Sequence, residues 1–338
     1  MIDSQSNLLL LFGMPRSGTT WIGKLFDSHK DTLYLHEPDS VKRSFDLPLL
    51  MSNDNDQSQE LKRQIDLWLN TDNEKVIASL PLFKKSYMNE PQWLTFYWSC
   101  YASKAISRSG LPIDIKPIHH HNPAKLVVWK SIESLGRMCE IKKVTGARSI
   151  HILRHPCGHI ASTINGEMQH NFFERSPIWE DWDLFDKLIT QSRDSRFRLK
   201  DIQRMDQVES LTVRWGLIND FALANNPDED NMVVLYEDMC TAPEQTFKQL
   251  LSFAGLEYTQ ENRDYISSST STNNKAYYAT DKHPLEAANK WRHTLSDDDI
   301  AIIESVSMMF KCGEYYQGTF RLDDSSVESS SDLQSGAA

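Results

Sequence analysis

The sequence predicts an α/β fold, a three-layer α/β/α domain around a central parallel sheet. Aliphatic and β-branched segments alternate with stretches of helical apolar periodicity, which is typical of βαβ units. Several of these segments are apolar throughout, which indicates strands covered on both faces. The predicted strands are residues 8–12, 32–35, 126–129, 149–153 and 232–235.

A glycine-flanked loop follows the first predicted strand. Residues 8–21 read LLLLFGMPRSGTTW, with a helix expected to begin after the loop. A strand that leads through such a loop into a helix directs backbone N–H groups and the positive end of the helix dipole at one point. Arg16, Ser17, Thr19 and Thr20 add further hydrogen-bond donors. The pattern predicts a phosphate or sulfate site, and a turn whose glycines serve only its conformation is the alternative.

The same loop is close in spacing to the nucleotide-binding loop GxxxxGK[ST]. Gly13 and Gly18 have the required separation, but Thr19 replaces the lysine that reaches the β- and γ-phosphates. This disfavours an ordinary ATPase or GTPase. The segment instead resembles the phosphosulfate-binding loop of sulfotransferases, P-[KR]-[ST]-G-T-T-x, which implies a P-loop NTPase-like fold. The implied cofactor is 3'-phosphoadenosine 5'-phosphosulfate (PAPS). The residues implied to bind it here are Arg16, Ser17, Gly18, Thr19, Thr20 and Trp21.

Two titratable residues, His36 and Glu37, follow the second predicted strand in the sequence YLHEPDS. Carbohydrate-type and several bacterial sulfotransferases have a glutamate followed by proline at this place, near the sulfuryl group. The resemblance therefore implies Glu37 as the general base, with His36 as the alternative. Because adjacent side chains of a strand point to opposite faces, only one of the two is expected to face the cofactor.

The third predicted strand ends in LVVWK, and Lys130 matches a lysine of cytosolic sulfotransferases. The resemblance implies that Lys130 assists the transfer, although a lysine with no catalytic role fits a strand end equally well. Cytosolic sulfotransferases use a histidine two residues further on as base, where this chain has Ile132, so the chain departs from that subgroup. The run His119, His120 and His121 is interpreted as a solvated loop rather than a part of the pocket or a metal site.

The fourth predicted strand closes with Arg154, and a helix is expected to begin near Pro156 in the sequence SIHILRHPCGHIAST. Ser162 follows on that helix at the spacing seen in sulfotransferases, where an arginine and a downstream serine hold the 3'-phosphate. The resemblance implies the same role for Arg154 and Ser162. Each residue alone also fits an ordinary surface position.

The fifth predicted strand ends in Tyr-Glu-Asp, and a helix follows from Pro243 to Gly255. The resemblance places Tyr236 near the adenine, with a half-buried packing role as the alternative. The sequence NKWR near the C-terminus resembles the family segment that folds over the cofactor. It implies Lys290 and Arg292 as phosphate partners, against the alternative of two solvated charges.

The chain of 338 residues is expected to form one domain over residues 1–322. Two aromatic-rich stretches without family motifs, about residues 40–122 and 170–207, are predicted to be helical insertions that form the acceptor pocket. Residues 323–338 have no apolar periodicity and are predicted to be disordered.

Composition excludes several classes of protein. The formal net charge of -11, from 36 basic and 47 acidic residues, argues against nucleic acid as a partner. No segment has the pattern of a signal peptide or of a membrane span. Five cysteines, an odd number without metal-ligand spacing, suit a reducing cytoplasm.

Together these features predict a sulfotransferase that moves the sulfuryl group of PAPS to a hydroxyl or amine of a small-molecule, lipid or carbohydrate acceptor by in-line displacement. As in phosphoryl transfer, the protein mainly positions groups and stabilises charge, with Arg16 at the leaving oxygen. No metal is expected, because no acidic strand end suits magnesium. A P-loop kinase that uses ATP and magnesium, or a nucleotide-binding relative without activity, are the alternatives.

Overall fold

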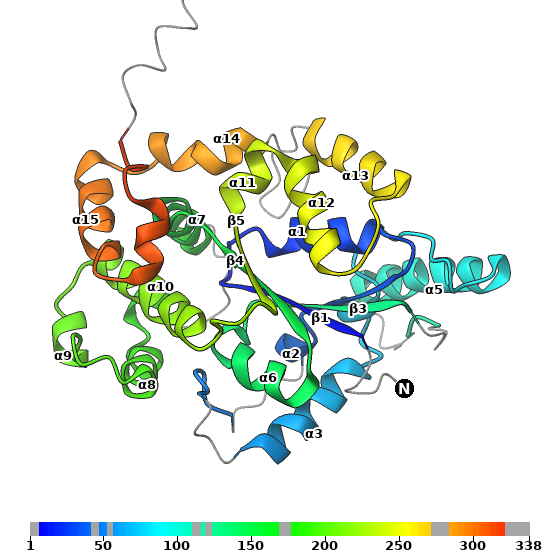
Figure 1. The fold of residues 1–338 in the computed structure, drawn as a ribbon, viewed down its shortest axis with the longest axis horizontal. Helices are drawn as coiled ribbons and strands as arrows, with labels where there is room; N and C mark the ends of the chain where they lie inside the picture. The colour runs from blue at the N-terminus through cyan, green and yellow to red at the C-terminus, as the bar shows by residue number, and fades with distance from the viewer. Residues whose placement is uncertain are drawn as a thin grey trace, which may run out of the picture.

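The computed structural model describes residues 7–41, 47–52, 57–109, 116–118, 124–168, 177–271 and 284–321, which form a central sheet with helices on both faces (Figure 1). All strand pairs in the described sheet are parallel, and the strand order is β2-β3-β1-β4-β5. The strands are β1 (Leu8–Gly13), β2 (Thr32–His36), β3 (Leu126–Ser131), β4 (Arg148–Leu153) and β5 (Asn231–Leu235).

Helices connect the strands and also make up much of the described part of the two predicted insertions. The α-helices are α1 (Thr19–Ser28), α2 (Pro38–Val41), α3 (Ser58–Leu69), α4 (Glu74–Ile77), α5 (Glu90–Ser109), α6 (Met138–Thr145), α7 (Pro156–Met168), α8 (Trp182–Ser192), α9 (Leu199–Ile202), α10 (Gln207–Ala224), α11 (Tyr236–Thr241), α12 (Pro243–Phe253), α13 (Gln260–Ser271), α14 (Pro284–Asn289) and α15 (Asp297–Ser307). The 3₁₀-helices are η1 (Leu135–Arg137), η2 (Ile178–Glu180), η3 (Lys290–His293) and η4 (Lys311–Tyr316).

The sheet separates two hydrophobic cores, because successive side chains of a strand point to opposite faces. Leu9 and Leu11 of β1 belong to the core that includes residues of α1, α12 and α13. Leu10 and Phe12 belong to the other core, which includes residues of α3, α6 and α10. Figure 1 shows α1, α12 and α13 together on one side of the sheet and α3 and α6 on the other. The apolar run of β1 is therefore explained by burial on both faces.

The parallel register brings all strand ends to one edge of the sheet. In the middle of the sheet, Leu11 of β1 is level with Lys130 of β3 on one side and with Ile150 of β4 on the other. His36, the last residue of β2, is also level with Lys130. Ligands of open parallel sheets bind at the carboxyl ends of the strands, so the segments that follow these strands lie where a site is expected.

The sequence locates the strands to within a residue or two at most ends, and the described parts of both insertions contain helices. One boundary is wrong: Tyr236 does not close the fifth strand but begins α11, because the chain turns helical directly after Leu235. The histidine run 119–121 and the tail 323–338 lie outside the described residues. Among the helices of the described residues, none combines the length and apolar composition that a membrane crossing requires.

A buried ion cluster anchors the helix that follows the glycine loop. Asp27 of α1 accepts hydrogen bonds from Lys24 Nζ (2.6 Å) and Lys85 Nζ (2.9 Å), and all three side chains are buried. Burial alone would raise the pKa of Asp27, but the two ammonium groups outweigh it and hold the pKa below its usual value. Asp27 therefore stabilises the fold above its ordinary pKa, and this contribution is lost as the pH falls through the lowered value.

Asp27→Asn is expected to lower the free energy of unfolding at neutral pH by about 3 kcal/mol, because it leaves two buried ammonium groups without their counter-charge. Urea unfolding measures the change, and the difference from wild type should shrink in acid. Asp72→Asn is the matched control, since Asp72 pairs with Lys116 on the surface and exposed pairs contribute under about 1 kcal/mol. Equal losses in the two variants would contradict this prediction.

Candidate functional site

The loop between β1 and α1 has two residues in the left-handed backbone region, Arg16 (φ 71°) and Gly18 (φ 87°). Ser17 lies between them, and its backbone N–H and hydroxyl both donate to the carbonyl of Met14 (3.1 and 2.7 Å). Gly18 is the N-cap of α1 and provides no side-chain acceptor. The first turn of α1 thus presents amide groups at its N-terminus, the arrangement that binds anions at helix ends.

The two loop glycines allow close packing. A Cβ atom on Gly13 would lie 2.5 Å from Ser17 Oγ and 2.8 Å from the carbonyl oxygen of Ile152 in β4. A Cβ atom on Gly18 would lie 2.2 Å from the ring of Tyr236. The loop is therefore pressed between β4 and the start of α11, and a larger residue at either position would displace it.

Gly18→Ala is expected to destabilise the protein by clearly more than Gly146→Ala. Gly146 also has a positive φ (66°) but has open space around its Cβ position, so its substitution costs only the left-handed strain of about 1–2 kcal/mol. Gly18→Ala adds the clash with Tyr236, and overpacking costs about 1–3 kcal/mol more. Urea unfolding of both variants separates the cost of backbone strain from the cost of the clash. Equal losses of stability would show that the ring of Tyr236 moves aside without a cost.

The polar residues predicted for the 3'-phosphate lie directly against this loop. Arg16 Nε donates to Ser162 Oγ in α7 (3.0 Å), and Arg154 Nη1 at the end of β4 donates to the carbonyl of Arg16 (2.6 Å). Arg154 Nε is buried and has no hydrogen-bond partner within the described residues. A buried guanidinium donor without an acceptor is costly, so this nitrogen is a donor suited to an anionic ligand.

Trp21 and Tyr236, two aromatic residues predicted to bind the nucleotide, lie next to these arginines. The ring of Tyr236 lies 4.8 Å below the guanidinium of Arg154, a cation–π arrangement, and 6.4 Å from the ring of Trp21 at an interplanar angle of 79°. The indole nitrogen of Trp21 donates to Ser269 Oγ in α13 (3.2 Å). Both rings are buried, so they form a rigid apolar wall next to the two arginines.

The C-terminal segment reaches the same region. Arg154 Nη2 donates to the carbonyl of Ala287 in α14 (3.3 Å). Arg292 stacks on the ring of its neighbour Trp291 (4.3 Å) and donates to the carbonyl of Thr319 (2.9 Å). Lys290 is exposed at the start of η3. The segment therefore packs over the end of β4, while Arg292 is engaged within the segment itself.

A second group of charged side chains lies on the other side of β1. The ammonium of Lys130, which is 1% exposed, forms an ion pair with the carboxylate of Glu37. His36 Nε2 lies 3.9 Å from Glu37 Oε1, and His36 Nδ1 shares a hydrogen bond of 2.8 Å with the hydroxyl of Tyr34. The two side chains therefore lie next to each other, and the expectation that only one of them faces the cofactor stays a prediction. Glu37 lies just beyond β2 with φ 51°, so the strand alternation no longer applies to it.

Burial controls the protonation of two of these groups. Burial, and then the ammonium groups of Lys130, Lys24 and Lys104, lower the pKa of His36 to about 2, so its imidazole is neutral and a weak base. Burial also lowers the pKa of Lys130, while the carboxylates of Glu37 and Asp39 oppose this shift. Glu37 is thus the stronger candidate for proton uptake among the two residues predicted for that role.

Comparisons with known proteins identify the family of the chain. A family model described as the sulfotransferase family matches residues 9–260, which include the glycine loop, Glu37, Lys130, Arg154 and Tyr236. The chain belongs to the sulfotransferase family. Carbohydrate sulfotransferase 1 of Danio rerio is 21% identical to this sulfotransferase over 341 residues, covering 90% of the chain and 76% of the relative.

Solved structures similar to this sulfotransferase include two sulfotransferase domains of larger systems and a mouse protein. The sulfotransferase domain of the curacin biosynthetic pathway has 16% identity and a TM-score of 0.44, covering 90% of this chain and 98% of that chain. The sulfotransferase domain of the Synechococcus PCC 7002 olefin synthase has 16% identity and a TM-score of 0.45, covering 90% and 96%. Mouse sulfotransferase SULT7A1 complexed with PAP has 12% identity and a TM-score of 0.39, covering 92% and 89%.

With the family established, the predicted fold class is confirmed as an α/β fold with a central parallel sheet covered by helices. The sequence reasoning missed one buried residue of this sulfotransferase, Asp39 in α2. Its carboxylate accepts hydrogen bonds from Ser131 Oγ (2.5 Å), Ser134 Oγ (2.6 Å) and the indole nitrogen of Trp129 (3.3 Å). The signal was present in the sequence as a third polar residue after the second strand, next to His36 and Glu37.

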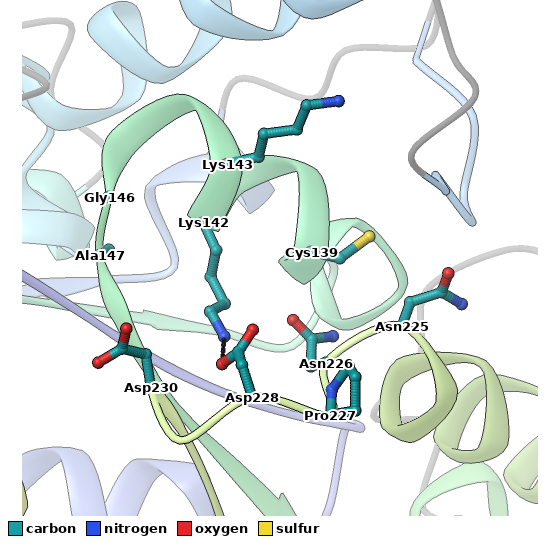
Figure 2. A pocket seen from close by; sticks show the side chains of 10 residues that line it. All are labelled: Cys139, Lys142, Lys143, Gly146, Ala147, Asn225, Asn226, Pro227, Asp228 and Asp230. Atoms are coloured by element: carbon teal, nitrogen blue, oxygen red, sulfur yellow. Dashed lines mark hydrogen bonds and ion pairs between the residues drawn. The ribbon is translucent and has the colours of Figure 1, made fainter.

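A cavity of about 330 Å³ opens at the opposite end of the strands, away from these residues. Figure 2 shows it between the C-terminal turn of α6 and the loop that precedes β5, with the ion pair between Lys142 and Asp228 at 2.5 Å. None of the predicted site residues of the sulfotransferase lines it. The candidate site therefore lies at the carboxyl edge of the sheet and not in this cavity.

Proposed function

We propose that this sulfotransferase transfers the sulfuryl group of PAPS to a hydroxyl or amine of its acceptor. The observation that carries the proposal is the convergence of Arg16, Ser162 and Arg154 on a glycine loop at a helix N-terminus. Anions bind at such an end through backbone amides, and arginine adds paired, charge-assisted hydrogen bonds.

The residues present suit a nucleotide with two anionic groups. The amides of α1 and the hydroxyls of Ser17, Thr19 and Thr20 would hold the 5'-phosphosulfate, and Arg154 with Ser162 would hold the 3'-phosphate. The buried, partnerless Nε of Arg154 is a donor that a phosphate oxygen would satisfy. Trp21 and Tyr236 would bound the adenine, and Lys290 and Arg292 would contribute from the C-terminal segment.

For the transfer itself, Glu37 would take the proton of the acceptor hydroxyl as the new oxygen–sulfur bond forms. The bond from sulfur to the bridging oxygen breaks, and adenosine 3',5'-bisphosphate leaves with the electron pair. Arg16 would stabilise the charge on that leaving oxygen, and Lys130 would assist from β3. Fixed charges at the reacting atoms are the main source of rate in such displacements.

The acceptor would bind among the insertions, which include α3, α5 and α8. Aromatic residues are frequent there, as in Trp93, Tyr97 and Trp98 of α5, whose rings contact one another at 5.5–5.6 Å. Small molecules, lipids and carbohydrates are the proposed classes, and the named activity of the Danio rerio relative makes carbohydrates the first to screen. All five cysteines are free and buried, which suits the reducing cytoplasm as the place of the reaction.

Calorimetric titration with adenosine 3',5'-bisphosphate, beside a titration with ATP and magnesium, tests the proposed function. Tight binding of the bisphosphate and release of sulfuryl groups from PAPS to an acceptor would support it. Preferred binding of ATP with magnesium would instead indicate a kinase. Binding of the bisphosphate without turnover of PAPS, for any acceptor or for water, would indicate a nucleotide-binding relative without activity.

A further inference from the structure

Asp39 lies at the point where the segments after β2 and β3 meet. It is two residues beyond Glu37, is 2% exposed, and accepts the three hydrogen bonds from Trp129, Ser131 and Ser134 described above. Ser131 Oγ in turn accepts the backbone N–H of Glu133 (3.1 Å) and of Ser134 (3.0 Å), so the turn after β3 is closed around it. One carboxylate therefore fixes the path of both segments.

The same two segments carry the Glu37 and Lys130 pair. Glu37 N–H donates to the carbonyl of Lys130 (2.9 Å), and the two side chains form an ion pair. Asp39 and Ser131 are close neighbours of Glu37 and Lys130 in sequence, so the two cross-links lie side by side. A shift of Asp39 would move the backbone that carries the ion pair.

Asp39 also provides a second negative charge near Lys130. The carboxylates of Glu37 and Asp39 both oppose the lowering of the Lys130 pKa by burial, and the Lys130 ammonium in turn lowers the pKa of His36. Burial raises the pKa of Asp39, while the hydrogen bonds from Ser131, Ser134 and Trp129 favour its charged form, and the Arg137 guanidinium also interacts with this carboxylate. A buried ammonium needs a counter-charge. If Glu37 takes a proton from the acceptor, its charge is lost at that moment, while the carboxylate of Asp39 remains.

We propose that Asp39 is a positioning residue for sulfuryl transfer: it anchors the Lys130 and Glu37 pair through Ser131 and Ser134, and it supplies the fixed negative charge beside Lys130 while Glu37 holds the proton. The inference rests on the proposed function. In the step it serves, the acceptor O–H proton moves to Glu37, the oxygen–sulfur bond forms, and the bisphosphate leaves with the electron pair. Lys130 stays protonated throughout.

The test compares Asp39→Asn, which keeps the shape and removes the charge, with Ser134→Ala, which removes one hydrogen bond and keeps the charge. Asp228→Asn, at the opposite end of the sheet, is the matched control that also removes a carboxylate from a lysine. The first readout is release of sulfate from PAPS to water, which needs no known acceptor. The second is titration of Lys130 by NMR with ¹³C-labelled lysine, its resonance assigned by its absence in Lys130→Met.

Asp39→Asn is expected to lower kcat about 10- to 100-fold while KM for PAPS changes less than about twofold. Without the Asp39 carboxylate the pKa of Lys130 falls further, so the alkaline limb of the rate profile and the NMR titration of Lys130 both move to lower pH. Ser134→Ala should reduce kcat without moving either, and Asp228→Asn should change nothing. A purely structural role of Asp39 would reduce the rate without moving the titration, and that result would overturn the inference.

The failure of the inference and of the proposed function are distinguishable. Wild-type protein that binds the bisphosphate but never releases sulfate from PAPS overturns the proposed function, whereas an unchanged Asp39→Asn beside an active wild type overturns only the inference. If Asp39→Asn loses bisphosphate binding and is unfolded, Ser131→Ala tests instead whether Asp39 anchors the Lys130 and Glu37 pair through Ser131. Wild-type kcat in Ser131→Ala would overturn it, and a decrease of about 3- to 10-fold with bisphosphate binding retained would support it.

Discussion

Replacement of Arg154 by alanine is expected to weaken binding of adenosine 3',5'-bisphosphate by about 100- to 1,000-fold. The guanidinium lies within reach of the loop through its bond to the carbonyl of Arg16, and its Nε is buried without a partner. Each charge-assisted hydrogen bond is worth about 1.5–3 kcal/mol, so the loss of two accounts for a change of that size. Calorimetric titration measures it.

Arg148→Ala is the matched control, because Arg148 lies on the same strand at its other end, is exposed, and pairs with Asp230 at 3.5 Å. It should leave the affinity unchanged. Arg154→Lys should recover only part of the binding, since lysine keeps the charge but lacks the planar pair of donors. Bisphosphate affinity in Arg154→Ala equal to that of wild type would remove Arg154 from the nucleotide site.

Glu37→Gln is expected to lower the turnover of PAPS by about 10²- to 10⁴-fold, the usual contribution of a general base, with bisphosphate binding kept. The amide cannot take up the acceptor proton, although it retains the size of the side chain. Steady-state release of bisphosphate measures turnover, and calorimetry on the same sample shows that the nucleotide site is intact.

Glu90→Gln serves as control for the loss of a lysine partner, because Glu90 pairs with Lys84 on the surface where both side chains are more than half exposed. It should turn over like wild type. Full turnover in Glu37→Gln would show that Glu37 is not the general base. His36→Ala would then be the next variant, although the pKa of His36 near 2 makes an imidazole base ineffective at neutral pH.

The sequence was informative where one residue type has one geometric consequence. The glycine loop with Arg16 was predicted from its residues as an anion site, and the resemblance to sulfotransferases implied Arg154 and Ser162 as further ligands. Hydrogen bonds connect the three residues. The strands were found because burial on both faces leaves an unbroken apolar run. The extent of the domain, residues 1–322, and the role of the insertions as an acceptor pocket stay predictions.

The remaining parts of the site depend on backbone angles and on contacts between distant segments, which periodicity does not encode. Glu37 lies beyond the end of β2 with φ 51°, and its carboxylate lies 3.9 Å from His36 Nε2. Within the described residues, the non-glycine residues with positive φ are Arg16, Glu37 and Arg193, so two of three belong to the candidate site. Backbone strain of this kind is common at functional sites, where contacts with the surrounding fold maintain the strained conformation.

The position of β1 in the middle of the sheet has a consequence for synthesis. β1 is synthesised before both of its neighbours in the sheet, because β3 and β4 begin only at Leu126 and Arg148. At about 5–20 residues per second, the run LLLLF waits on the order of ten seconds before either partner strand exists. During that time both edges of β1 lack their partner strands, which leaves an apolar segment open to pairing with other chains.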